Sequence, residues 1–252
     1  MRLSTVRLSA FSFVAFLGLS LAAQAGSRPL ALVYKGPGSC VSDGHCSEAA
    51  AAVADRAGFD VEFVGPKSHD MTLFREAAVY IQPGGNSTEV GEAMTEGMKR
   101  LLRDFVAEGG GYVGFCAGGF FAMSPFPGYP RLGLIRGDAD GLEEDSPSIV
   151  SVSWTDGLRH HVYWEGGPFF ILPRSSNFEV VSRYALNRKP ASIRGEVGQG
   201  RVWVSGYHPE APYDWRFHPT LEDSDGTKAD LDMAVEMIRW SARAHPMRSR
   251  LR

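Results

Sequence analysis

Short apolar runs that end in glycine turns alternate with longer helix-forming stretches over the first half of this chain. The expected strands are residues 29–34, 59–64, 77–81 and 111–115, and the helices expected between them are residues 47–57 and 89–108. Strands that alternate with helices of this length indicate βαβ units and a parallel sheet covered on both faces. Since 44% of the residues are hydrophobic and 22% are charged, disorder and coiled coil are excluded. The sequence therefore predicts a flavodoxin-like, doubly wound α/β fold.

The second half of the chain has a different pattern. Its strand-like stretches are residues 149–154, 178–184, 191–197 and 201–205, and an amphipathic helix is expected over residues 230–244. The last two strands are separated by Gly198-Gln-Gly200, which predicts a hairpin. We therefore expect a mostly antiparallel extension after the parallel half, within a single domain that covers residues 27–252.

The N-terminal residues have the pattern of an export signal. Arg2 and Arg7 are followed by an apolar run over residues 10–23, and Ala23-Gln-Ala25 has small residues where a signal peptidase requires them. The apolar run is about 14 residues long, whereas a membrane span needs roughly 20. We expect residues 1–25 to be a cleaved signal peptide and the mature protein to be periplasmic or secreted, with no membrane contact. The net charge of −3 gives no indication of nucleic-acid binding.

Two of the three cysteines lie close together in a loop rich in glycine and serine. In an oxidising compartment, a turn there would let Cys40 and Cys46 form a disulfide. Two free thiols, or a metal site with His45, are the alternatives. Five residues separate the cysteines and no second ligand cluster is present, so we expect no metal. Cys116 is left unpaired.

Cys116 lies in the motif Gly114-Phe-Cys-Ala-Gly-Gly119, at the junction of an expected strand and a helix. A nucleophile elbow needs small residues two positions before and after the nucleophile, because its backbone is strained and closely packed. The N-terminus of the following helix would favour the thiolate. The alternative is a buried cysteine in a tight glycine turn.

A second motif, His208-Pro-Glu210, follows the last expected strand. Proline disfavours helix at the residue before it, and residues two apart in an extended chain project to the same side. Glu210 can therefore orient the His208 imidazole while the other ring nitrogen faces a thiol. A surface loop with an incidental ion pair would give the same tripeptide.

Taken together, the two motifs resemble the class I glutamine amidotransferase superfamily. That resemblance implies a flavodoxin-like core with Cys116 as nucleophile, His208 as general base and acid, and Glu210 as the residue that orients it. Within the superfamily the chain is similar to the amidotransferase-like domain at the N-terminus of eukaryotic biotin-protein ligases and to its free-standing bacterial relatives. The other segments that carry this likeness are Val33-Tyr-Lys-Gly-Pro-Gly38, Gln82-Pro-Gly-Gly85 and Val162-Tyr-Trp-Glu-Gly-Gly-Pro-Phe169.

The resemblance also implies an oxyanion hole formed by the backbone N–H groups of Gly85 and Ala117. A plain strand-ending turn is the alternative for Gly84-Gly85. Tyr163 and Glu165 are candidate substrate-binding residues, with the Glu165 carboxylate available to an amine or amide. The alternative for this segment is an aromatic strand and turn in the core.

The function expected is hydrolysis of an amide bond in a small molecule or peptide, through a thioester and without a cofactor. Glutamine amidotransferases normally pass ammonia to a nucleotide-using synthetase, and an exported chain has no obvious access to one; the sequence identifies no protein partner. A catalytically silent binding module on the same fold is a second hypothesis. A peptidase or glyoxalase-like enzyme of a neighbouring superfamily is a third, and the intact His208-Pro-Glu210 argues against it.

Overall fold

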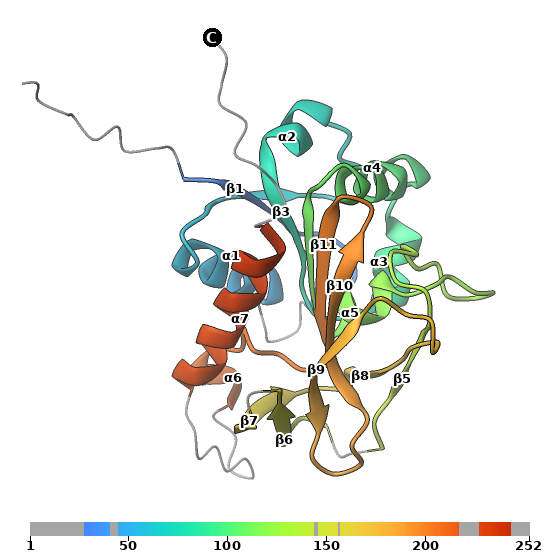
Figure 1. Cartoon of the computed structure of the whole chain (residues 1–252). Coiled ribbons are helices and arrows are strands. Elements are labelled where there is room, and N and C mark those ends of the chain that lie inside the picture. Colours follow the sequence, from blue (N-terminus) through green and yellow to red (C-terminus); the bar gives the residue numbers. More distant parts are fainter. Residues whose placement is uncertain (1–27, 41–44, 144–145, 156, 217–226, 243–252) are drawn as a thin grey trace, which may run out of the picture.

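The computed structural model describes residues 28–40, 45–143, 146–155, 157–216 and 227–242, and the predicted signal peptide lies outside these residues (Figure 1). A nine-stranded sheet forms the centre of the molecule. In spatial order its strands are β2 (Asp60–Val64), β1 (Leu30–Tyr34), β3 (Ala77–Gln82), β4 (Gly111–Phe115), β11 (Gly200–Ser205), β10 (Pro190–Val197), β9 (Glu179–Tyr184), β6 (Ser148–Trp154) and β7 (Arg159–Trp164). A separate antiparallel pair is formed by β5 (Asp138–Gly141) and β8 (Pro168–Ile171).

The sheet has a parallel part and an antiparallel part. Strands β2, β1, β3, β4 and β11 pair in parallel, whereas β10, β9, β6 and β7 continue the sheet antiparallel. The hairpin predicted at Gly198-Gln-Gly200 joins β10 to β11. One feature was not predicted: β11, which pairs antiparallel with β10 as the hairpin requires, also pairs parallel with β4 and so is the fifth strand of the parallel part. Its parallel neighbour is provided by an earlier part of the chain, which the local pattern of β11 does not specify.

Helices cover both faces of the parallel part (Figure 1). Helices α1 (Cys46–Arg56) and α7 (Thr227–Ala242) lie on one side, and α3 (Ser87–Ala93), α4 (Glu96–Ala107) and α5 (Ala117–Ala122) lie on the other. Each side has its own apolar core: Val53 and Ile238 belong to the first, and Met98 and Leu102 to the second. The remaining helices are the short α2 (Met71–Glu76) and α6 (Tyr213–Arg216). The predicted doubly wound α/β fold is therefore confirmed.

The helix expected over residues 89–108 is in fact two helices. The chain leaves helical geometry at Met94, and Thr95 begins α4 as its N-cap, with the Thr95 hydroxyl accepting a hydrogen bond from the Met98 N–H at 3.2 Å. The Thr95 N–H donates to the Pro66 carbonyl at 3.1 Å. Apolar residues on both sides of the break face the same core, so the helical period continues across it and hides it.

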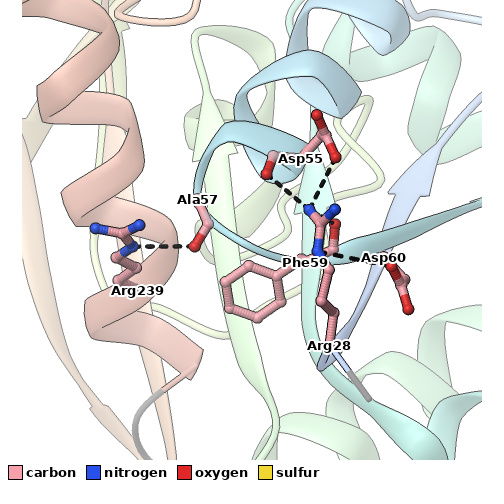
Figure 2. A network of polar contacts seen from close by, with 6 residues as sticks. All are labelled: Arg28, Asp55, Ala57, Phe59, Asp60 and Arg239. Atoms are coloured by element: carbon pink, nitrogen blue, oxygen red, sulfur yellow. Dashed lines mark hydrogen bonds and ion pairs between the residues drawn. The ribbon is translucent and has the colours of Figure 1, made fainter. Parts of the chain in front are cut away.

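Two arginines bind the backbone at the turn between α1 and β2 (Figure 2). The Arg28 guanidinium donates to the carbonyl oxygens of Asp55 and Phe59 at 2.7 and 2.5 Å, and Arg239 of α7 donates to the Ala57 carbonyl at 3.0 Å. The last carbonyls of a helix lack partners within it, so these contacts satisfy the end of α1 and join it to α7. Over the described ranges, no helix has the length and apolar character that a bilayer span requires.

Candidate active site

Cys116 occupies a strained turn between β4 and α5. Its φ of 48° and ψ of −106° lie in a region that residues with a side chain rarely adopt. A side chain at Gly114 would place its Cβ 2.6 Å from backbone atoms of Gly118, and one at Gly118 would overlap the Gln82 carbonyl oxygen. The spacing of glycines in the motif is therefore a steric requirement of this turn. The Cys116 N–H donates to the Ser205 carbonyl of β11 at 2.9 Å, so the turn is also hydrogen-bonded to the neighbouring strand.

His208 and Glu210 lie just beyond the end of β11, next to the Cys116 turn. The His208 Nδ1 atom is 2.9 Å from Glu210 Oε1, and only 2% and 1% of these two residues are exposed. The His208 N–H donates to the Tyr163 carbonyl at 2.9 Å, which fixes the backbone that carries the imidazole. On the opposite side, a Cβ at Gly84 would collide with His208 Cε1. The imidazole is therefore held by an ion-pair partner, a backbone bridge and a glycine contact.

The surroundings of His208 favour its protonated form. Burial alone lowers the pKa of the imidazole, because a charge is less stable away from water. Electrostatic interactions with Cys116 and Glu210, together with hydrogen bonds to both side chains, outweigh burial and raise the pKa of His208 well above its ordinary value. Such an imidazolium stabilises a neighbouring thiolate.

The Cys116 sulfur lies beneath the turn that follows β7. Only 4% of Cys116 is exposed, and its thiol donates a weak hydrogen bond to the Glu165 carbonyl at a sulfur–oxygen distance of 3.5 Å. A Cβ at Gly167 would lie 3.2 Å from the sulfur, and the Trp164 indole N–H fixes this residue by donating to the Gly167 carbonyl at 3.0 Å. This turn, residues 165–167, therefore covers the sulfur in the described structure.

The two candidate substrate-binding residues lie together beside the base. The Tyr163 hydroxyl donates to Glu165 Oε2 at 3.1 Å, and the Tyr163 ring centre is 5.7 Å from that of His208. Burial and then the charge of Glu165 raise the pKa of Tyr163, which therefore remains a neutral donor. Trp215 of α6, which we did not predict, packs edge-on against His208 at 5.6 Å and lies 5.9 Å from Tyr163. The aromatic pair of Tyr213 and Trp215 just after the His208 motif was the available signal.

The two amides proposed for the oxyanion hole lie in the turns that follow β3 and β4. Neither the Gly85 N–H nor the Ala117 N–H donates to an acceptor among the described residues. Gly85 has a φ of 128°, a conformation that suits glycine. The loop after β1 holds the Gly85 turn, through bonds from Cys40 N–H to the Gly84 carbonyl at 3.3 Å and from Asn86 N–H to the Gly38 carbonyl at 2.7 Å.

The loop cysteines are bonded to each other in the structure. Cys40 and Cys46 form a disulfide with a Cα–Cα distance of 5.5 Å, and Cys116 is a free thiol. Within the part of the chain that the structure describes, no group of three or more His, Cys, Asp or Glu side chains is arranged to hold a metal ion.

Comparison with known proteins agrees with the resemblance seen in the sequence. Residues 30–126 match the family model described as "Biotin-protein ligase, N terminal". The chain is 30% identical over 160 residues to the biotin–protein ligase of Schizosaccharomyces pombe, a match that covers 53% of this chain but only 25% of that protein. It is also 30% identical over 166 residues to the pyridoxal 5′-phosphate synthase subunit PdxT of Deinococcus radiodurans, covering 59% of this chain and 79% of PdxT.

A solved structure titled "Crystal structure of glutamine amidotransferase" shares the fold, with a TM-score of 0.59 and 20% sequence identity over 84% of this chain and 99% of that one. The fold is therefore that of class I glutamine amidotransferases. Because it is 30% identical to PdxT over 79% of that protein, the chain belongs to the same family as PdxT, and its residues 30–126 match the biotin-protein ligase N-terminal model.

Proposed function

We propose that this protein is an exported, cysteine-dependent hydrolase that cleaves an amide bond in a small molecule or peptide. The observation that carries the proposal is the position of Cys116, at a positive φ and in electrostatic contact with a buried His208–Glu210 pair. Backbone strain of this kind costs about 1–3 kcal/mol and persists where the surrounding fold enforces it, often at active sites. A structural cysteine in a turn would need neither the strain nor the imidazole.

In the first half of the reaction, the Cys116 thiolate attacks the amide carbonyl carbon. The carbonyl π electrons move to oxygen, and the N–H groups of Gly85 and Ala117 stabilise the oxyanion. Each such donor contributes about 2.7–4 kcal/mol in enzymes where one has been removed. The His208 imidazolium gives its proton to the leaving nitrogen, the C–N bond breaks, and an acyl thioester remains on Cys116 as an amine or ammonia departs.

In the second half, neutral His208 takes a proton from water, and the water oxygen attacks the thioester carbonyl. The C–S bond then breaks, the thiolate re-forms beside the imidazolium, and a carboxylic acid leaves. Glu210 stays ionised and orients the imidazole throughout, as the acid does in related triads. No cofactor takes part in these steps.

The export motif of residues 1–25 supports hydrolysis over transfer of ammonia to a synthetase. Ammonia transfer needs a partner that consumes a nucleotide, which is scarce outside the cytoplasm. We propose that Tyr163 and Glu165 bind the substrate at the site entrance, with the Glu165 carboxylate accepting from its amide or amine.

The test is labelling of Cys116 in the folded protein by a glutamine-analogue chloroketone, followed by intact mass. Cys116→Ala should remove labelling and any hydrolysis. Glu210→Gln keeps the shape of the side chain but loses the charge beside His208, so it should slow labelling without abolishing it. His208→Ala should slow it further, because only the backbone dipoles near the sulfur then favour the thiolate.

One observation favours the second candidate, a binding module that no longer turns over. The sulfur is covered by the Glu165 carbonyl and by Gly167, and only 4% of Cys116 is exposed. Labelling no faster than that of a free thiol, and unchanged in Glu210→Gln and His208→Ala, would favour this candidate over the hydrolase.

A further inference from the structure

The loop that follows β1 lies directly against the turn proposed to form the oxyanion hole. Ser39 and Gly85 form an antiparallel bridge. The two flanking hydrogen bonds run from Cys40 N–H to the Gly84 carbonyl at 3.3 Å and from Asn86 N–H to the Gly38 carbonyl at 2.7 Å. The direction of the Gly85 N–H is therefore set by contacts with residues 38–40.

These contacts leave little room for movement. A Cβ at Gly85 would overlap the Gly38 carbonyl oxygen and lie 2.6 Å from the Cys40 nitrogen. On its other side the turn touches the base, because a Cβ at Gly84 would collide with His208 Cε1. A displacement of the loop after β1 would thus be transmitted to the Gly85 amide.

The disulfide anchors this loop at its far end. Cys40 carries the N–H that binds Gly84, and its bonded partner Cys46 is the fully buried first residue of α1. Ser47, the next residue, donates from its hydroxyl to the Tyr34 carbonyl at 2.8 Å, which fixes the start of α1 to the end of β1. Cys40 is thus covalently joined to the start of α1, which is itself bonded to the end of β1.

We propose that the Cys40–Cys46 disulfide is a positioning element of the oxyanion hole, and this inference rests on the proposed function. It keeps residues 38–40 against the turn after β3, so that the Gly85 N–H points at the oxygen of the reacting carbonyl. The thiolate depends on it only through the Gly84 contact with His208, because Cys116 is held by β4 and β11, and His208 mainly by Tyr163 and Glu210. Loss of the disulfide should therefore weaken the step that forms an oxyanion and leave the nucleophile itself intact.

The experiment compares two reactions of Cys116 in the wild type and in Cys40→Ala/Cys46→Ala. The chain has three cysteines, so Cys116 is the only free thiol in both proteins. Acylation by a p-nitrophenyl ester passes through an oxyanion, whereas alkylation by iodoacetamide does not. We expect the acylation rate to fall about 10- to 100-fold, less than the 100- to 1,000-fold typical for removal of a donor. Alkylation should change by less than about twofold, since thiolate content is unchanged.

Two matched variants separate this role from a loss of stability. Gly85→Ala disturbs the turn directly and should reproduce the selective loss of acylation. Arg28→Ala removes the two backbone contacts of Arg28 in Figure 2, remote from the disulfide, and should leave the ratio of the two rates unchanged. If the double alanine variant does not fold, the wild type reduced by a phosphine serves instead, with both reactions followed on the peptide that contains Cys116.

Equal losses in the two reactions, or no loss in either, would overturn the positioning role. Rapid acylation of the wild type together with an unchanged variant rejects this inference and leaves the hydrolase proposal standing. Wild-type Cys116 that is acylated no faster than a free thiol rejects both.

Discussion

His208 connects the charged groups of the candidate site. It lies between the Cys116 thiol and the Glu210 carboxylate, and almost none of its surface is exposed. The interactions with Cys116 and Glu210 favour the charged form of the buried imidazole in the folded protein more than in the unfolded chain. The stability of the fold should therefore depend on pH through this residue.

The sign follows from the raised pKa of His208 in the folded state. The folded protein binds this proton more tightly, so the stabilisation is complete below the unfolded value of about 6.5 and is lost as the pH rises through the raised pKa. Urea unfolding from pH 6 to 9 should show the advantage of the wild type over His208→Gln decreasing with pH. Cys116→Ala removes one negative partner and should weaken this dependence. An advantage that grows with pH would contradict the interpretation.

At the scale of helices and strands, the break between α3 and α4 sets the direction of each helix. It therefore determines where the buried residues Gly91 of α3 and Met98 of α4 pack. The exposed Thr95 side chain stabilises the second helix at this break, since its hydroxyl caps α4. Thr95→Ala should lower the free energy of unfolding by about 1 kcal/mol. For a domain of this size that corresponds to a melting temperature about 2–4 °C lower. Thr88→Ala, in which the lost hydroxyl has no hydrogen bond to a described residue, is the control and should melt like the wild type.

The sequence predicted the elements whose cause is local. Gly114 and Gly118 flank Cys116 because the turn itself leaves no space, and the hairpin at Gly198 is a short-range signal, so both were visible. The break at Thr95 was missed because apolar residues continue the helical period across it. The cover formed by Glu165 and Gly167 was missed as well, because it depends on how distant segments pack. The contact of residues 38–40 with the Gly84-Gly85 turn, on which the disulfide proposal rests, was missed for the same reason.

At the scale of the whole molecule, export and the disulfide make one joint prediction. Cleavage after Ala25 would give a mature protein that begins at Gly26, in a compartment where Cys40 and Cys46 can be oxidised. Mass spectrometry of protein recovered from the periplasm or medium should show that N-terminus and a mass two hydrogens below that of the fully reduced chain. Recovery of an intact Met1 in the cytoplasmic fraction would contradict it.

The parallel pairing of β11 with β4 has a consequence for how such a protein comes into being. The strand that leads to the nucleophile is made early, but its neighbour, which leads to His208 and Glu210, is made far downstream, after the whole antiparallel part. A nascent chain therefore contains the thiol without its base. Contacts between such distant segments form slowly, because the intervening chain must first be ordered. Cys116 would thus become reactive only after β11 has paired with β4. A reactive thiol would therefore indicate that the chain has folded completely.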